Sequence, residues 1–324
     1  MYISQTRDGR VIWRVENQAN VIKNTSTTYE FVLTAISSGL TLGGLVAQRG
    51  LGETVDLQDL LKNDLLDCPI RHPDAAHMFL TGTGLTHLGS AETRDTMHSE
   101  ETPEELTDSM KMFRLGLEGG KPAKGETGVQ PEWFYKGTGH TAVAPGQSLT
   151  SPDFAMDGGE EPEIAGVYVI SEDCKPYRVG FALSNEFSDH LLESQNYLYL
   201  AHSKLRPASF GPEILVGELP KNIRGMSKIM RNGETVWEKP FLSGEENMSH
   251  SVSNLEHHHF KYGLFCQPGD VHIHMFGTAT LSFADDVDLN EGDIFEISAP
   301  DFGLPLCNPL AKEKERHITI EGLA

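Results

Sequence analysis

Three glutamates are spaced so that their carboxylates can meet at one point. Glu161 and Glu163 precede the apolar run of residues 164–170, and Glu186 follows a second extended run at residues 177–184. Side chains two apart on an extended chain point to the same face, so Glu161 and Glu163 can converge. A ligand set made only of oxygen atoms, with room for water and substrate, favours Mg²⁺ or Mn²⁺ over zinc. The alternative is an acidic turn, with Glu186 at a solvated helix start.

The second extended run predicts a pocket beside these carboxylates. Val179, Phe181 and Leu183 are expected to face one side of the strand,. The opposite side carries only small side chains before it ends in Glu186. If the two runs lie near each other, three carboxylates meet where there is space for something beside them.

Histidines offer a second possible metal site, and the sequence argues against it. The run at residues 257–259 has three successive imidazoles, which cannot all face one ion from a regular strand,. His272 and His274 share a strand face, but a zinc site needs further ligands that the sequence does not supply,. We interpret this pair as a polar strand face near a pocket.

Charge and composition restrict the classes of partner. The chain has 324 residues and a net charge of −21, with 26 basic and 47 acidic side chains. Such a field repels nucleic-acid phosphates and anionic membrane surfaces, so we expect neither as a partner. An anionic substrate must then be held by a metal or by a few placed cations.

The remaining bulk features predict a cytoplasmic protein. The four cysteines are scattered without a CxxC pair, which is typical of reduced, buried thiols,. The N-terminus has no basic segment followed by an apolar core, so no signal peptide is expected,. The longest apolar stretch, at residues 31–47, is too short and too interrupted by small residues to span a bilayer,.

The elements that position these residues divide into two predicted domains. Residues 1–75 are expected to form a small N-terminal α/β domain, with a strand or hairpin arm over residues 10–22 and helices over 26–38 and 55–66,. Residues 76–324 form the catalytic domain. The polar segment at residues 89–102 is either a lid or a solvated connection,. A capping box at residues 102–105 then predicts a helix whose buried stripe includes Leu117 and which stops at Gly119-Gly120,.

Beyond residue 133 the pattern is mainly β. Asn232-Gly233 between two apolar runs predicts a two-residue hairpin,. Further strands are predicted at residues 271–275, 280–283 and 294–297, and one helix at 189–202,.

A series of small motifs surrounds the carboxylates in a recognisable order. They are Phe134-Tyr135-Lys136-Gly137 before the glutamates, then Lys204, Gly211-Pro212, Gly269-Asp270, Gly277-Thr278 and Gly292-Asp293. In this order and spacing, residues 78–310 resemble the fumarylacetoacetate hydrolase superfamily. The resemblance implies an α+β, mainly β fold, in which a mixed sheet is rolled into a sandwich with peripheral helices. It also implies a homodimer and a metal held by Glu161, Glu163 and Glu186.

Two departures from that family's pattern indicate the reaction. Glu186 stands where the family usually has an aspartate, so the metal can be slightly displaced. The lid's water-activating His and Glu are replaced by Ser90 and Thr93. Loss of that dyad fits the sugar-acid branch, which eliminates water from 2-keto-3-deoxypentonates to give 2,5-dioxopentanoate through a metal-stabilised enolate.

The resemblance also suggests roles for individual residues. Lys204 is expected to be the cation, or if desolvated the amine, nearest the enolate,. Glu92 is the expected lid acid or base, with Ser90 and Thr278 hydrogen-bonding to substrate oxygens. The remaining expected substrate contacts are Lys136, Arg94 and His87.

Two other functions stay open. One is a hydrolase or decarboxylase of 2,4-diketo or acylpyruvate-type acids, in which His87 and Glu92 replace the missing dyad. The other is a sugar-acid binding protein without catalysis.

Overall fold

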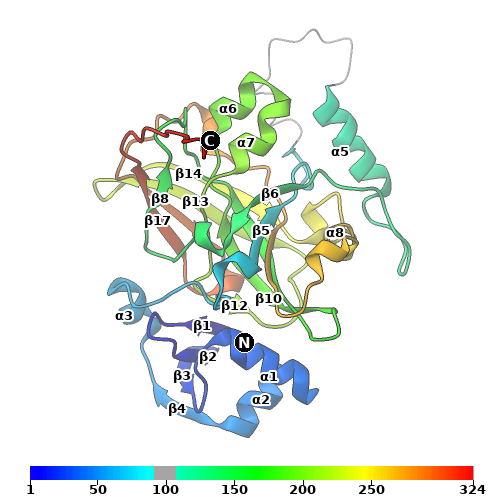
Figure 1. Cartoon of the computed structure of the whole chain (residues 1–324), viewed down its shortest axis with the longest axis vertical. Coiled ribbons are helices and arrows are strands. Elements are labelled where there is room, and N and C mark those ends of the chain that lie inside the picture. The colour runs from blue at the N-terminus through cyan, green and yellow to red at the C-terminus, as the bar shows by residue number, and fades with distance from the viewer. Residues whose placement is uncertain (91–106, 324) are drawn as a thin grey trace.

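Two β-sheets form the body of the molecule, and helices lie around their margins (Figure 1). The computed structural model describes residues 1–90 and 107–323. Within these residues one sheet has twelve strands and the other has five. The mainly β architecture with peripheral helices agrees with the expectation from the sequence.

The larger sheet has the order β4-β3-β2-β1-β12-β10-β9-β15-β5-β6, with β11 paired to β10 and β7 paired to β11. Its strands are β1 (Tyr2–Gln5), β2 (Val11–Val15), β3 (Gln18–Ile22), β4 (Leu51–Thr54), β5 (Met78–Gly82), β6 (Phe134–Thr138), β7 (Ala142–Val143), β9 (Pro162–Ile170), β10 (Pro176–Asn185), β11 (Ala208–Phe210), β12 (Ile214–Leu215) and β15 (Val271–Met275). The smaller sheet has the order β14-β13-β16-β17-β8. Its strands are β8 (Leu149–Ser151), β13 (Ile223–Arg231), β14 (Glu234–Ser243), β16 (Ile294–Ser298) and β17 (Leu306–Lys312).

The helices are short, and several begin at a side chain that caps the first turn. They are α1 (Thr28–Ser38), α2 (Leu42–Arg49), α3 (Leu57–Lys62), α5 (Asp108–Gly119), α6 (His190–Gln195), α7 (Leu200–Lys204) and α8 (Val252–Phe260). Asp56 caps α3, which ends earlier than predicted because Asp64 adopts a left-handed conformation with φ 58°,. Thr107 caps α5; the predicted capping box lies outside the described residues. Leu117 is exposed, so its predicted place in the buried stripe is wrong.

The N-terminal part of the chain contains helices α1 and α2, and the residues predicted as a strand or hairpin arm form a complete hairpin, β2–β3. Within the described residues, no single helix is long and apolar enough to cross a membrane. Helices α1 and α2 reach that length and composition only together, and they are bent by 101° where they meet. Strand β1 pairs with β12, so the N-terminal strands continue the larger sheet.

The hairpin of β9 and β10 lies at the centre of the larger sheet. β9 is buried along its whole length and pairs with β10 on one side and β15 on the other. A β-bulge between Arg178 and Gly180 shifts the register. Val179 therefore packs in the same core as Ala182, and the prediction that it shares a face with Phe181 and Leu183 is wrong,.

Two hydrophobic cores cover the two faces of this hairpin. On one face, Val167, Val169 and Ala182 pack with residues of α1 such as Phe31. On the other, Phe181 and its neighbours pack against the smaller sheet and the segment after β15. The hairpin is thus fixed on both sides, and its end carries the three glutamates.

The later part of the chain contains the predicted hairpin and two of the three strands expected there. Asn232 and Gly233 connect β13 to β14 with φ of 53° and 84°, the positive values that a two-residue hairpin requires,. Strands β15 and β16 confirm two of the late predictions. The strand predicted at 280–283 is wrong: residues Ser282–Asp285 form a 3₁₀ turn. The amide and hydroxyl of Ser282 donate to the buried carboxyl of Glu160. The amide is therefore not available for hydrogen bonding to a neighbouring strand.

The helix predicted at residues 189–202 is divided into α6 and α7. Asn196 has an extended backbone (φ −163°, ψ 129°), and its side chain accepts a hydrogen bond from the amide of Leu198. A side chain that caps the backbone in this way competes with the continuing helix. The break brings Lys204, at the end of α7, back toward the start of α6.

Candidate metal centre and active site

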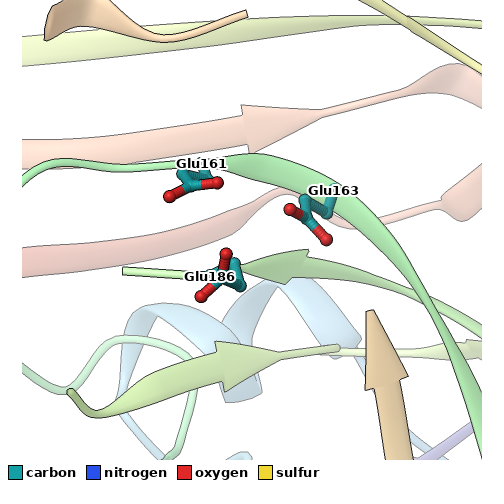
Figure 2. A group of neighbouring side chains, drawn as sticks. All are labelled: Glu161, Glu163 and Glu186. Carbon is teal, nitrogen blue, oxygen red and sulfur yellow. The ribbon is translucent and has the colours of Figure 1, made fainter. Parts of the chain in front are cut away.

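Glu161, Glu163 and Glu186 lie together at one end of the β9–β10 hairpin (Figure 2). Glu163 pairs in register with Ser184, and the amide of Glu186 donates to the carbonyl of Glu161 at 3.1 Å. This pairing places the third carboxylate opposite the first two. Each residue offers a carboxylate oxygen, and these oxygens all lie within 4.8 Å of one another. All three side chains are buried.

The environment of Glu163 fits a hard divalent cation. One of its oxygens accepts a hydrogen bond from the amide of Gly277 at 2.7 Å. The other is buried and has no hydrogen-bond partner in the described structure. Burial, together with the charges of Glu186 and Glu161, raises the pKa of this carboxyl well above its usual range,. A cation among three carboxylates would satisfy that oxygen, and Mg²⁺ and Mn²⁺ prefer such ligands.

Lys204 contributes positive charge directly to two of the three glutamates. Its Nζ donates to Glu161, to Glu186 at 2.9 Å and to the hydroxyl of Ser188 at 3.2 Å. Burial would lower the pKa of this ammonium, but the charges of Glu161, Glu186 and Glu193 raise it above its usual value,. Of the two forms expected from the sequence, the geometry therefore favours the cation over the neutral amine.

Lys136 contacts the cluster through Glu186. Its Nζ lies 2.8 Å from that carboxylate and donates to the carbonyls of Phe187 and Lys204. Burial lowers the pKa of this ammonium, although the charge of Glu186 acts to raise it. Lys136 does not line the cavity beside the glutamates, so its predicted contact with substrate stays a prediction, and the structure shows it holding Glu186.

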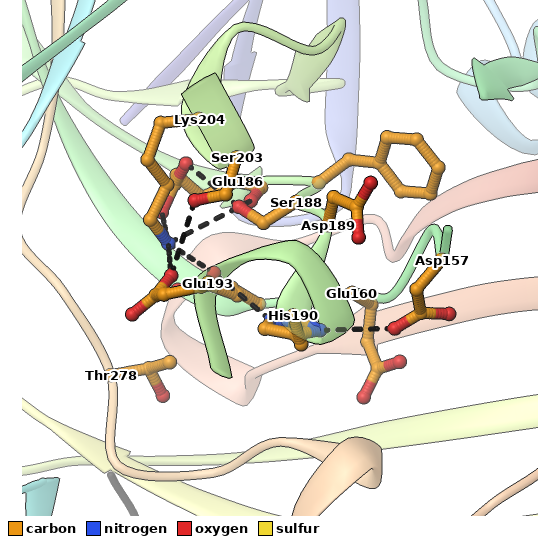
Figure 3. Close-up of polar contacts among 12 residues, drawn as sticks. Asp157, Glu160, Glu186, Ser188, Asp189, His190, Glu193, Ser203, Lys204 and Thr278 are labelled. Carbon is orange, nitrogen blue, oxygen red and sulfur yellow. Dashed lines mark hydrogen bonds and ion pairs between the residues drawn. The ribbon is translucent and has the colours of Figure 1, made fainter. Parts of the chain in front are cut away.

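His190 joins the site although its position in the sequence suggested only a helix start. Its Nε2 lies 3.1 Å from Glu161, and its Nδ1 lies 3.7 Å from Asp157 (Figure 3). Burial would lower the pKa of this imidazole, but its interactions with Asp157 and Glu161 raise it to about 10. Its position four residues after Glu186 gave no signal of this contact, because residues 186–189 lie outside α6 and only the fold places the ring beside Glu161.

A cavity of about 30 Å³ adjoins the glutamates, enough for a cation or a water molecule,. The three glutamates and Lys204 line it together with Thr83, Gly84, Leu85, Ser90, Phe134, His190, Glu193, Gly277, Thr278 and Leu281. The structure thus brings Ser90 and Thr278 to the cluster, as expected from the sequence. Glu92 and Arg94 lie outside the described residues.

His87 is buried beside the cavity without lining it. Its Nε2 lies 2.9 Å from the hydroxyl of Ser243, and its Nδ1 lies 3.1 Å from the hydroxyl of Thr86. Burial lowers its pKa to about 3, so it is neutral at physiological pH. Both ring nitrogens contact protein groups, and the predicted contact of His87 with substrate stays a prediction.

The other histidines and the cysteines are separate from this site. Residues 257–259 lie in α8, and His259 contacts His272 at 3.0 Å within a buried group of aromatic rings. Among the residues that the structure describes, the three glutamates are the only group of three or more potential metal ligands that converge. The cysteines are unpaired; Cys68 is buried, but Cys174 is exposed, so the prediction of buried thiols is wrong there.

Comparison with known proteins shows which enzymes the chain is similar to. No protein-family model matches the chain. A 2-dehydro-3-deoxy-D-arabinonate dehydratase of Saccharolobus solfataricus is 28% identical over 193 residues, which cover 58% of this chain and 61% of that enzyme. The match therefore spans less than two thirds of that enzyme's length.

Solved structures show the fold over nearly the whole chain. A 2-keto-3-deoxy-D-arabinonate dehydratase complexed with magnesium and 2,5-dioxopentanoate aligns with a TM-score of 0.72 at 20% identity, covering 97% of this chain and 100% of that chain. The maleylpyruvate hydrolase of Sphingobium sp. SYK-6 aligns over the same shares with a TM-score of 0.58 at 13% identity. The predicted fold is confirmed, and the match in sequence agrees with the expected resemblance to sugar-acid dehydratases.

Proposed function

We propose that the chain is a metal-dependent dehydratase that converts a 2-keto-3-deoxypentonate to 2,5-dioxopentanoate. One observation carries the proposal: three buried glutamates converge, and one oxygen of Glu163 has no partner, beside the ammonium of Lys204. The likeness in sequence and fold to dehydratases of 2-keto-3-deoxy-D-arabinonate supports the substrate class.

Glu161, Glu163 and Glu186 would hold Mg²⁺ or Mn²⁺. When bound, such an ion supplies Lewis-acid polarisation of the substrate's 2-keto group, which acidifies the protons on C3. Lys204 places a fixed positive charge next to the same carboxylates, where negative charge develops as a C3 proton is removed,. Its raised pKa keeps it protonated, so its role is electrostatic.

The hydroxyls of Ser90 and Thr278 would hydrogen-bond to substrate oxygens, since both line the cavity. A base removes one C3 proton, and the C4 hydroxyl leaves as water after it gains a proton. Tautomerisation through C5 then gives the aldehyde. We assign the acid or base of the lid to Glu92, and the substrate's carboxylate or hydroxyl end to Arg94.

The hydrolase or decarboxylase alternative rests on the fold it shares with a maleylpyruvate hydrolase. It needs His87 as a base next to Glu92. Because both ring nitrogens of His87 contact hydroxyls of the protein, this geometry favours dehydration. A sugar-acid binding protein without catalysis would be stabilised against unfolding by the sugar acid and would convert no 2-keto acid to product.

The test is turnover of both C4 epimers of 2-keto-3-deoxypentonate with Mg²⁺, assayed for 2,5-dioxopentanoate. We expect aldehyde that disappears with EDTA and with Glu163→Gln. The exposed Glu234→Gln provides a matched control that should keep wild-type turnover. Pyruvate or another cleavage product from diketo acids, without aldehyde, would instead establish the hydrolase.

We further propose the organisation of the protein around this site. Residues 1–75 would be a small domain and residues 76–324 the catalytic domain, which agrees with the position of β1–β4 and α1–α3 before residue 75. We also propose a homodimer, on the family resemblance, and a cytoplasmic location, on the scattered, unpaired cysteines,. Light scattering on a sizing column would test the dimer.

A further inference from the structure

The loop that leads into Glu161 is attached to the two residues just before α6. The amide of Met156 donates to the carboxylate of Asp189 at 3.0 Å. Gly159 and Ser188 exchange two backbone hydrogen bonds, at 2.9 and 3.0 Å. The position of Glu161, two residues after Gly159, therefore depends on how this loop sits against α6.

His190 occupies the space between that loop and the cluster. It is 1% exposed, with Nδ1 at 3.7 Å from Asp157 (Figure 3). Its Nε2 lies 3.1 Å from Glu161, so the ring contacts both ends of the loop. The absence of a side chain at Gly159 makes room for the ring: a Cβ there would lie 2.7 Å from Nδ1. The ring of Phe283 lies on another side, with centroids 5.4 Å apart.

We propose that His190 is a positioning residue for the metal site, which fixes the carboxylate of Glu161 through Nε2 while Asp157 and Gly159 fix the ring. Nε2 of His190 and Nζ of Lys204 contact the same oxygen of Glu161. Two donors on one oxygen hold the carboxylate plane and leave the second oxygen for a cation. Partners of this kind around a ligand typically change metal affinity about 10- to 100-fold when removed.

This inference rests on the proposed metal site, and one experiment separates the two. We would measure Mn²⁺ binding by calorimetry and by electron paramagnetic resonance for wild type, His190→Gln and His190→Asn. Glutamine can place its amide N–H near the position of Nε2, whereas asparagine mimics only Nδ1. We expect His190→Gln to bind Mn²⁺ nearly as wild type does, and His190→Asn to bind it about 10- to 100-fold more weakly.

Gly159→Ala tests the same geometry without altering a charged group. Its methyl group would displace the ring, so we expect Mn²⁺ affinity to fall as it does in His190→Asn. Asp286→Asn, in the same groove as Asp157, is the control that should bind like wild type. Melting temperatures of all variants show whether folding alone has changed.

The outcomes are distinct. If wild type binds no Mn²⁺, the metal site fails and this inference fails with it. If wild type binds Mn²⁺ and His190→Asn binds it equally well, the metal site stands and the positioning role is refuted. If His190→Gln loses affinity as fully as His190→Asn, the contact through Nε2 is not what positions Glu161.

Discussion

Replacing Gly277 with alanine should damage both the fold and the metal site. Gly277 has a φ of 92°, and its amide donates to Glu163 at 2.7 Å. A Cβ at this position would collide with the hydroxyl of Thr86 and lie 2.7 Å from the carbonyl oxygen of Thr83. The backbone would have to move, and the amide that holds Glu163 would move with it.

The cost has two parts that a control can separate. Positive φ disfavours alanine by about 1–2 kcal/mol. Forcing a methyl group into a packed region costs about 1–3 kcal/mol more. Gly233 has a φ of 84°, and a Cβ added there would have no atom within 4 Å, so Gly233→Ala should show only the first part. We therefore expect Gly277→Ala to lose about 2–5 kcal/mol of unfolding free energy.

Urea denaturation of both variants in EDTA measures these costs, and a Mn²⁺ titration measures the effect on the site. We expect Gly277→Ala to be less stable than Gly233→Ala and to bind Mn²⁺ more weakly than wild type. Equal stability of the two variants, with unchanged Mn²⁺ affinity, would refute the reasoning about the close approach at Gly277.

Three further results are expected. Lys204→Met removes the ammonium that contacts both Glu161 and Glu186, so it should abolish turnover and cost about 3–5 kcal/mol of unfolding free energy in EDTA,. Lys175→Met, at an exposed ion pair, should leave stability nearly unchanged, and similar losses in the two variants would contradict this reasoning,. Burial raises the pKa of Glu160 to about 7, so its contribution to stability is complete below pH 4.5 and is lost as pH rises through 7,. The free energy of unfolding of Glu160→Gln should therefore exceed that of wild type by about 3 kcal/mol at pH 8. Urea denaturation should show this difference shrinking toward pH 5. Burial lowers the pKa of His259 to about 3, so its contribution to stability is complete above pH 6.5 and is lost as pH falls toward 3,. The loss amounts to about 2 kcal/mol at pH 5. His259→Phe should therefore reduce the slope of unfolding free energy against pH between pH 7 and 5, and an unchanged slope would contradict the lowered pKa of His259.

The centre of the site was predictable from the sequence because local regularity governs it. Glu161 and Glu163 occupy alternate positions at the start of a strand, and Glu186 follows the strand that pairs with it. In such a hairpin, period-two alternation determines which side chains share a face. The hairpin at Asn232-Gly233 was predictable for a similar reason, since its two positive φ values require particular residues,.

The errors arose where tertiary contacts outweigh local pattern. The bulge at Val179 reverses the alternation of β10; Gly180 beside it is a local signal of a bulge, but strict period-two alternation does not include such a shift,. The segment after β15 has the apolar character of a strand, but Ser282 binds the buried Glu160 instead. His190 joins the site only because α6 folds back over the loop before Glu161, a contact between segments that periodicity does not describe.

The order of strands in the larger sheet has a consequence for how the chain folds. β1, at residues 2–5, pairs with β12 at residues 214–215, and β5, at residues 78–82, pairs with β15 at residues 271–275. Before such distant segments can pair, the long chain between them must close into a loop, which costs conformational entropy. These pairings therefore form slowly. Gly277, whose amide donates to Glu163, lies two residues after the end of β15. During synthesis the metal-binding pocket therefore cannot be completed until more than four fifths of the chain has emerged.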